Sequence, residues 1–268
     1  MATVELYHET AGEGRPVVLL HPGFADSRIW DPQWQSYAER FRVVRCDLPG
    51  FGRSPIHSLP VRYARDVAAL LDRLEIEEAA LVGCSLGGRV ALELAIARPD
   101  LVGALVLAGA ATPEALATAP ETTAYASALM EAIRNRDLDA AVEVNLRAWV
   151  DGHHRTRGQV DADVRAKIAS MQRDAFENTR EFAASWQEEM LISDLADRLS
   201  EIRVPTLVLV GELDMDFLHE QARVFADRIP MAQLQTIPGT AHAPSIERPL
   251  AFDQSVIPFL TTATTERE

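Results

Sequence analysis

Residues 79–98 read AALVGCSLGGRVALELAIAR and combine a strand, a glycine-rich turn and the start of a helix. The apolar run Ala80–Val82 predicts a buried strand, and apolar residues at helical spacing from Val90 onward predict a helix. Between them, Gly83–Gly87 fits the pattern G-x-S-x-G with Ser85 at its centre. In this context the turn strains the serine backbone and exposes its hydroxyl above the sheet, so we predict Ser85 as a nucleophile.

Length, composition and charge limit the class of protein. The 268 residues can form one large α/β core, with or without an insertion, and 47% hydrophobic residues are typical of a globular protein. A net charge of −14 disfavours nucleic acid and anionic membranes as partners, and no apolar run approaches the ~18 residues of a transmembrane helix. We therefore expect a soluble protein that binds a small molecule.

The cysteines and the start of the chain predict a cytoplasmic location. Cys46 and Cys84 lie at the ends of predicted buried strands, which is typical of reduced core thiols rather than of a disulfide framework. The segment TVELYHET (3–10) mixes polar and apolar residues, unlike the apolar segment of a secretory signal peptide.

Strands and helices alternate at both ends of the chain, which favours a parallel sheet covered by helices. Besides the strand before Ser85, short apolar runs predict strands at Pro16–Leu20, Arg42–Cys46, Ala104–Leu107, Pro205–Val210 and Leu234–Ile237. Helical spacing predicts helices at Arg62–Leu74, Phe217–Arg228 and Pro249–Leu260. We therefore predict an α/β fold with a mostly parallel sheet flanked by helices.

Residues 112–200 differ from the rest because they show long helical patterns and no convincing strand. The predicted helices span Glu121–Asn135, Leu138–Val150, Val160–Asn178 and Thr179–Leu199. Such a helical segment between two strands of one sheet indicates a cap, or lid, over the carboxyl edge of the sheet. Residues 1–111 and 201–268 would then form the core.

A serine nucleophile needs an adjacent base, and the base needs a third group that orients it. Asp214 and His242 each follow a later strand, so the chain carries Ser85, Asp214 and His242 in that order. We predict that His242 accepts the proton of Ser85 and that Asp214 orients the imidazole. Asp216 and, more remotely, Glu114 are the alternatives to Asp214.

Backbone N–H groups beside Ser85 would stabilise an oxyanion. Leu86 and Gly23 are the predicted donors, with Phe24 as the alternative to Gly23, and His21 is expected to shape the loop that carries them. Arg89, in the helix after Ser85, is either structural or a ligand for a substrate carboxylate.

We expect no metal and no organic cofactor. His153 and His154 are adjacent, but no third ligand stands at zinc-site spacing. The glycine-rich loop at 47–54 follows a strand, yet it matches neither of the common nucleotide-binding patterns.

Together these motifs resemble the α/β-hydrolase superfamily over essentially the whole chain. The segments that carry this resemblance are HPGF (21–24), DLPGFGRS (47–54), GCSLGG (83–88), GELD (211–214) and GTAHAPSIERP (239–249). The resemblance implies the α/β-hydrolase fold with an inserted helical cap and a Ser-Asp-His triad. The serine departs from the haloalkane dehalogenases and epoxide hydrolases of the superfamily, which carry an aspartate there.

A nearer resemblance is to the 3-oxoadipate enol-lactonase-like group of small esterases and lactonases. It depends on HPGFADSRIWDPQW (21–34) and WVDG (149–152). Many relatives read His-Gly-x where this chain has His21-Pro22-Gly23, which leaves Gly23 and Phe24 open as the second oxyanion donor.

The leading hypothesis is a serine hydrolase that cleaves a carboxylic ester or lactone through an acyl-enzyme on Ser85. Phe24, Met130, Leu146 and Trp149 are the expected lining of its apolar pocket. The alternatives are a carbon–carbon bond hydrolase of ring-fission diketones and, in a different class, a ligand receptor on a hydrolase scaffold. Whether the chain forms a homodimer is open.

Overall fold

The computed structural model describes residues 5–263. Seven strands form one sheet in the order β1-β3-β2-β4-β5-β6-β7, in which β1 is antiparallel to β3 and the other neighbours are parallel. The strands are β1 (His8–Ala11), β2 (Pro16–Leu20), β3 (Arg42–Cys46), β4 (Ala79–Cys84), β5 (Val102–Ala108), β6 (Thr206–Gly211) and β7 (Ala232–Ile237). The predicted mostly parallel sheet is confirmed.

Helices cover both faces of the sheet, which explains why the central strands are continuous apolar runs. Buried side chains of α2, α3 and α9 pack on one face, and those of α1 and α11 pack on the other. Around the sheet lie α1 (Asp31–Ala38), α2 (Tyr63–Arg73), α3 (Leu86–Ala97), α8 (Leu195–Arg198), α9 (Asp216–Arg228), α10 (Pro244–Glu247) and α11 (Pro249–Ala263). Short 3₁₀ turns are η1 (Ser27–Trp30), η3 (Arg157–Gln159), η4 (Ala183–Ser185) and η5 (Leu199–Glu201).

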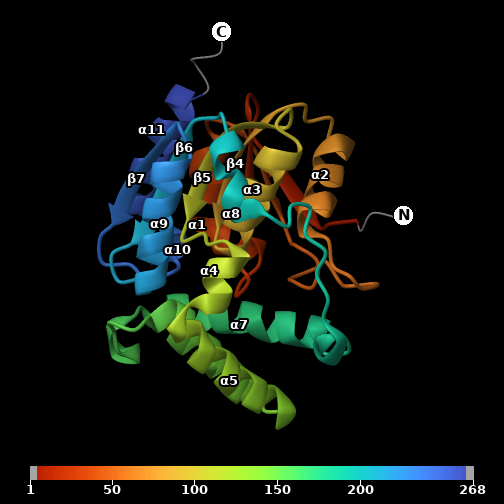
Figure 1. Cartoon of the computed structure of the whole chain (residues 1–268), viewed down its shortest axis with the longest axis vertical. Coiled ribbons are helices and arrows are strands. Elements are labelled where there is room, and N and C mark those ends of the chain that lie inside the picture. Colours follow the sequence, from red (N-terminus) through yellow and green to blue (C-terminus); the bar gives the residue numbers. More distant parts are fainter. Residues whose placement is uncertain (1–4, 264–268) are drawn as a thin grey trace.

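Between β5 and α8 lie four α-helices and a π-helical turn, and Figure 1 shows α4, α5 and α7 gathered at one end of the sheet. We call them the inserted helices: α4 (Pro113–Thr118), α5 (Pro120–Arg134), α6 (Leu138–Asn145), the π-helical turn η2 (Leu146–Asp151) and α7 (Ala162–Thr179). Their role as a cap and the domain boundaries at 111 and 201 stay predictions. Residues 1–4 and 264–268 of the predicted core lie outside the described residues.

The predicted helix at Thr179–Leu199 is wrong. This segment holds only the 3₁₀ turn η4 and the single turn of α8. Val61 forms a parallel β-bridge with Glu188, and hydrogen bonds of 2.9 Å join Val61 to the residues on both sides of Glu188. Pairing with a distant part of the chain thus satisfies backbone groups that a helix would otherwise satisfy, and it overrides the local propensity.

Other expectations concern membranes and thiols. Within residues 5–263 no helix has both the length and the apolar character needed to cross a membrane. Cys46 and Cys84 are buried and free, and burial raises the pKa of both thiols, that of Cys46 to about 12.

His21 braces the loop that follows β2. The side chain is fully buried, with Nδ1 2.9 Å from the carbonyl oxygen of Pro22, while Nε2 accepts the N–H of Leu48 at 2.9 Å. A carbonyl only accepts and an N–H only donates, so the ring is neutral with its proton on Nδ1. Burial lowers the pKa of His21 below its ordinary value of 6.5.

This lowered pKa predicts a pH dependence of stability. Below pH 6.5 the unfolded state binds a proton at His21 that the folded state excludes, so stability is full above that pH and falls as pH drops, by up to about 1.4 kcal/mol per pH unit. We expect His21→Gln to weaken the fall in melting temperature between pH 7.5 and 5. The control His57→Gln, at an exposed position, should keep the wild-type slope. An unchanged slope in His21→Gln would contradict the assignment.

Candidate active site

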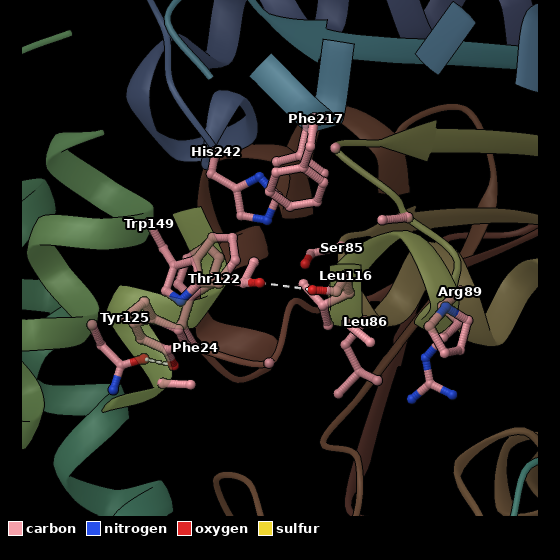
Figure 2. A pocket seen from close by; sticks show the side chains of 18 of the residues that line it. Phe24, Ser85, Leu86, Arg89, Leu116, Thr122, Tyr125, Trp149, Phe217 and His242 are labelled. Carbon is pink, nitrogen blue, oxygen red and sulfur yellow. Dashed lines mark hydrogen bonds between the residues drawn. The ribbon is translucent and has the colours of Figure 1, made fainter. Parts of the chain in front are cut away.

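Ser85 lies in the tight turn between β4 and α3. Its backbone φ of 50° and ψ of −111° fall in a region that costs a non-glycine residue about 1–3 kcal/mol. The N–H of Ser85 donates to the carbonyl of Ala108 in β5 at 2.8 Å, which holds the turn against the neighbouring strand. The turn presents Ser85 to a cavity at this edge of the sheet (Figure 2).

Glycine is required beside Ser85 because three backbone segments meet there. A Cβ at Gly87 would overlap the carbonyl oxygen of Leu20 in β2, and a Cβ at Gly83 would overlap the backbone of Gly87. Rotating a side chain cannot relieve either clash, since the opposing atoms belong to the backbone. Only glycine at both positions therefore lets α3 start directly against β2 and β4.

His242 and Asp214 form a buried pair. Nδ1 of His242 lies 2.9 Å from Oδ2 of Asp214, and the two side chains are 1% and 2% exposed. Oδ1 of Asp214 accepts the N–H of Met215 at 2.9 Å, which orients the carboxylate. A carboxylate only accepts hydrogen bonds, so the proton of a neutral imidazole ring is on Nδ1 here. Nε2 of that ring then keeps its lone pair.

Nε2 of His242 is buried and has no hydrogen-bond partner among the described residues. The ring and Ser85 border the same cavity, and Figure 2 shows both side chains facing it. An imidazole in this state can accept a proton within the cavity. The structure thus brings the three predicted residues Ser85, Asp214 and His242 to one edge of the sheet.

The two alternatives to Asp214 lie elsewhere. The side chain of Asp216 is 83% exposed and lies 4.0 Å from Nε2 of His154. Glu114 is exposed on α4. Asp214 is therefore the carboxylate that pairs with His242.

A cavity of about 760 Å³ extends from Ser85 toward the inserted helices. Trp149 and Phe24 line it as predicted, with ring centroids 4.9 and 5.6 Å from that of His242. Tyr125 packs edge-on against Trp149 at 5.2 Å, and its hydroxyl donates to Oδ1 of Asn145 at 2.8 Å. Aromatic walls with a few polar groups suit a small, largely apolar ligand.

Met130 and Leu146 do not line this cavity, which corrects the prediction for both. Met130 is 49% exposed and borders a separate hollow between α5 and α7, because α5 turns Tyr125 toward the cavity instead. Leu146 is 3% exposed and packs into the apolar core, while the π-helical turn directs Trp149 to the cavity. Helical spacing identified apolar positions on these helices but not the face that each one occupies.

Gly23 and Leu86 border the cavity beside Ser85. A Cβ at Gly23 would lie 3.6 Å from Cδ2 of Leu86, so the loop after β2 packs on the start of α3. The first N–H groups of a helix have no acceptor within the helix, which suits the N–H of Leu86 for binding an anion. Phe24 also borders the cavity, so both candidates for the second donor lie at the site.

Gly109, just after β5, is a further residue of the site that the sequence analysis missed. Its φ is +56°, and a Cβ there would lie 2.9 Å from Nδ1 and Cε1 of His242. The imidazole therefore occupies space that any other residue would fill. The signal available in the sequence was a lone glycine at the end of a predicted strand.

Glu247 and Arg155, also missed, hold the loop that carries His242. Oε1 of Glu247 accepts the N–H groups of Ala241 and Ala243, on either side of His242, at 3.1 and 3.3 Å. Oε2 pairs with Arg155 at 2.6 Å, and both side chains of this pair are buried. Glu247 lies in a segment that carried the family resemblance, whereas no pattern marked Arg155.

Arg155 also reaches the π-helical turn of the inserted helices. Its guanidinium donates to the carbonyls of Val150 and Asp151 at 2.7 and 3.0 Å. Trp149, which packs on His242, belongs to the same turn. One arginine therefore ties the loop of the histidine to the wall of the cavity.

Arg89 and the adjacent histidines His153 and His154 are the remaining candidates from the sequence. Both terminal nitrogens of Arg89 are occupied, by Glu93 at 3.0 Å and by Glu188 at 2.6 Å. His153 and His154 are exposed, and within residues 5–263 no three His, Cys, Asp or Glu side chains gather as metal ligands.

The chain is similar to known proteins along nearly its whole length. The chain is 28% identical to a pimeloyl-[acyl-carrier protein] methyl ester esterase of Nitrosospira multiformis, over 97% of this chain and 99% of that protein. It is 27% identical to a 2-hydroxy-6-oxo-6-phenylhexa-2,4-dienoate hydrolase of Burkholderia cepacia, over 97% and 92%. The solved structure of an enol-lactonase from Burkholderia xenovorans LB400 superposes with a TM-score of 0.77 at 25% identity, over 96% and 97%.

The family described as alpha/beta hydrolase fold matches residues 16–249. This match spans β2 to the start of α11 and includes Ser85, Asp214 and His242. The chain therefore belongs to the alpha/beta hydrolase fold family.

Proposed function

We propose that the protein is a serine hydrolase that cleaves a carboxylic ester or lactone through an acyl-enzyme on Ser85. The observation that carries this proposal is the buried His242–Asp214 pair, whose free Nε2 borders the same cavity as Ser85. The named esterase and enol-lactonase among the similar proteins support an enzyme that acts on ester bonds. The inserted helices act as the cap that encloses the substrate.

Acylation begins when Oγ of Ser85 attacks the carbonyl carbon of the ester. His242 accepts the hydroxyl proton at Nε2, and Asp214 stabilises the imidazolium through Nδ1. The carbonyl electrons move to the oxygen, which the N–H of Leu86 and that of Gly23 or Phe24 stabilise. One such donor contributes on the order of 3 kcal/mol to the transition state.

Collapse of the tetrahedral intermediate expels the alcohol, which takes the proton from Nε2 of His242. A water molecule then attacks the acyl carbonyl, gives its proton to His242, and the acid leaves as Oγ of Ser85 regains that proton. In a lactone the alcohol and the acid are parts of one molecule, so ring opening gives a single hydroxy acid.

Carbon–carbon bond hydrolysis of a ring-fission diketone is the second candidate. The dienoate hydrolase among the similar proteins favours it, and such a reaction uses the same family of folds. The receptor hypothesis has no comparable support. Turnover of a diketone with no turnover of esters would favour the second candidate, and ligand binding without turnover would favour a receptor.

Replacement of Ser85 tests the mechanism. We expect Ser85→Ala to lower the hydrolysis of a short-chain p-nitrophenyl ester by at least about 1,000-fold, because the nucleophile is lost. Intact mass after incubation with a fluorophosphonate should show one adduct on the wild type and none on the variant. Turnover that survives in Ser85→Ala would exclude the acyl-enzyme.

A methyl group at Gly109 tests the position of His242. We expect Gly109→Ala to lower kcat/KM by about 100-fold, because a displacement of the imidazole by about 1 Å is enough for such a loss. Gly14→Ala is the control: it also has a positive φ, but the nearest atom to its Cβ lies 4.0 Å away. Equal activities of the two variants would contradict an effect of the contact with His242.

The link between Arg155 and Glu247 tests how the inserted helices support the site. Arg155→Met leaves the buried carboxylate of Glu247 unpaired, so we expect the free energy of unfolding in urea to fall by about 3–5 kcal/mol. Adding Glu247→Gln removes the charge and should recover part of this loss, since Gln still accepts both backbone N–H groups. Additive effects of the two changes would contradict a direct link.

A further inference from the structure

One side of the cavity carries its charged groups. Among the described residues that line the cavity, the Asp, Glu, Lys and Arg side chains are those of Arg89 and Glu188. Arg89 follows Ser85 by one turn of α3, and its N–H donates to the carbonyl of Ser85 at 3.0 Å. Figure 2 shows Arg89 on the far side of Ser85 from Trp149. The cavity therefore has an aromatic side at Trp149 and an ionic side at Arg89.

The guanidinium of Arg89 is neutralised before any substrate enters. Nη2 pairs with Glu188 at 2.6 Å and Nη1 pairs with Glu93 at 3.0 Å. Glu93 is 2% exposed and also accepts the N–H of Leu191 at 2.7 Å, so it is fixed in place. Even if Glu93 is protonated, Glu188 alone balances the charge of Arg89.

Glu188 is held at the cavity by its backbone. The β-bridge with Val61 fixes the chain on both sides of it, with hydrogen bonds of 2.9 Å. Its side chain is 26% exposed and lines the cavity, unlike that of Glu189, which pairs outside it with Arg62 and Arg65. Glu188 is thus a built feature of the cavity rather than a mobile surface charge.

We propose that Glu188 selects substrates by their charge. Because Glu188 neutralises Arg89, the cavity accepts esters whose part next to α3 is uncharged and rejects esters with a terminal carboxylate. Among the described residues that line the cavity, a carboxylate there meets no unpaired cation, and it lies against the carboxylate of Glu188, so like charges oppose its binding. The proposal rests on the proposed ester hydrolysis and names its substrate class as neutral, largely apolar esters or lactones.

Two esters of equal chain length measure this preference. Methyl hexanoate and monomethyl adipate differ only in a terminal methyl group or carboxylate, and a pH-stat at pH 7.5 follows the acid that each releases. We expect wild type to favour methyl hexanoate in kcat/KM by at least about 30-fold, and Glu188→Gln to reduce this ratio at least about tenfold. The reduction should arise mainly from a lower KM for monomethyl adipate, because Arg89 can then pair with it.

Glu189→Gln is the matched control. It removes the same charge from the neighbouring position, but Glu189 does not contact Arg89. We expect its preference to stay within about twofold of wild type. Fluorophosphonate labelling of Ser85 in each variant checks that the fold and the nucleophile are intact.

The outcomes separate this proposal from the proposed function. Hydrolysis of both esters at similar rates, a preference for monomethyl adipate, or equal shifts in the two glutamate variants would overturn the role of Glu188 and leave ester hydrolysis standing. If wild type cleaves neither ester, the proposed function fails, and calorimetry with hexanamide and adipic acid monoamide measures the charge preference instead. Equal binding of these two amides, or no binding of either, would then overturn the role of Glu188.

Discussion

The contact between Gly87 and the carbonyl oxygen of Leu20 is the constraint on which the site depends. It lets α3 begin directly against β2, so the chain must turn sharply after β4, and Ser85 takes a positive φ at the tip of that turn. This strain costs about 1–3 kcal/mol. Burial and backbone hydrogen bonds in the surrounding sheet and helices offset that cost. Neighbouring strands then place Gly109 and the His242–Asp214 pair around the same point.

Ion pairs link the inserted helices and the segment around Glu188 to this rigid edge. Arg155 joins Glu247, under the loop of His242, to the turn that carries Trp149. Arg89 joins α3 to the segment around Glu188. In each case removal of one partner would leave a charge in a poorly solvated place, so the pairs favour one arrangement of the cavity wall over others. The same pairing leaves the cavity without an unpaired cation among its described residues, despite the arginine beside Ser85.

Similarity along nearly the whole chain does not identify the reaction, because the similar proteins have different names. An esterase, an enol-lactonase and a dienoate hydrolase align with nearly the whole chain at 25–28% identity. The shared fold does not decide which bond is cleaved, because that depends on the groups that line the cavity. In this chain many of those groups come from the loop after β2, the inserted helices and the segment at Glu188, where local patterns are weakest.

Motifs at strand ends allowed the sequence by itself to determine the sheet and the family, and to predict that Ser85, Asp214 and His242 meet. Parallel strands bring their carboxyl ends to one edge, so order along the chain is enough to predict this meeting. The sequence did not determine which faces of the inserted helices line the cavity, and it predicted a helix where Glu188 instead pairs beside Val61. Met130 and Trp149 are both apolar residues on predicted helices, yet one faces outward and the other contacts His242. Only the tertiary structure decides such positions, because they depend on contacts between residues far apart in the chain.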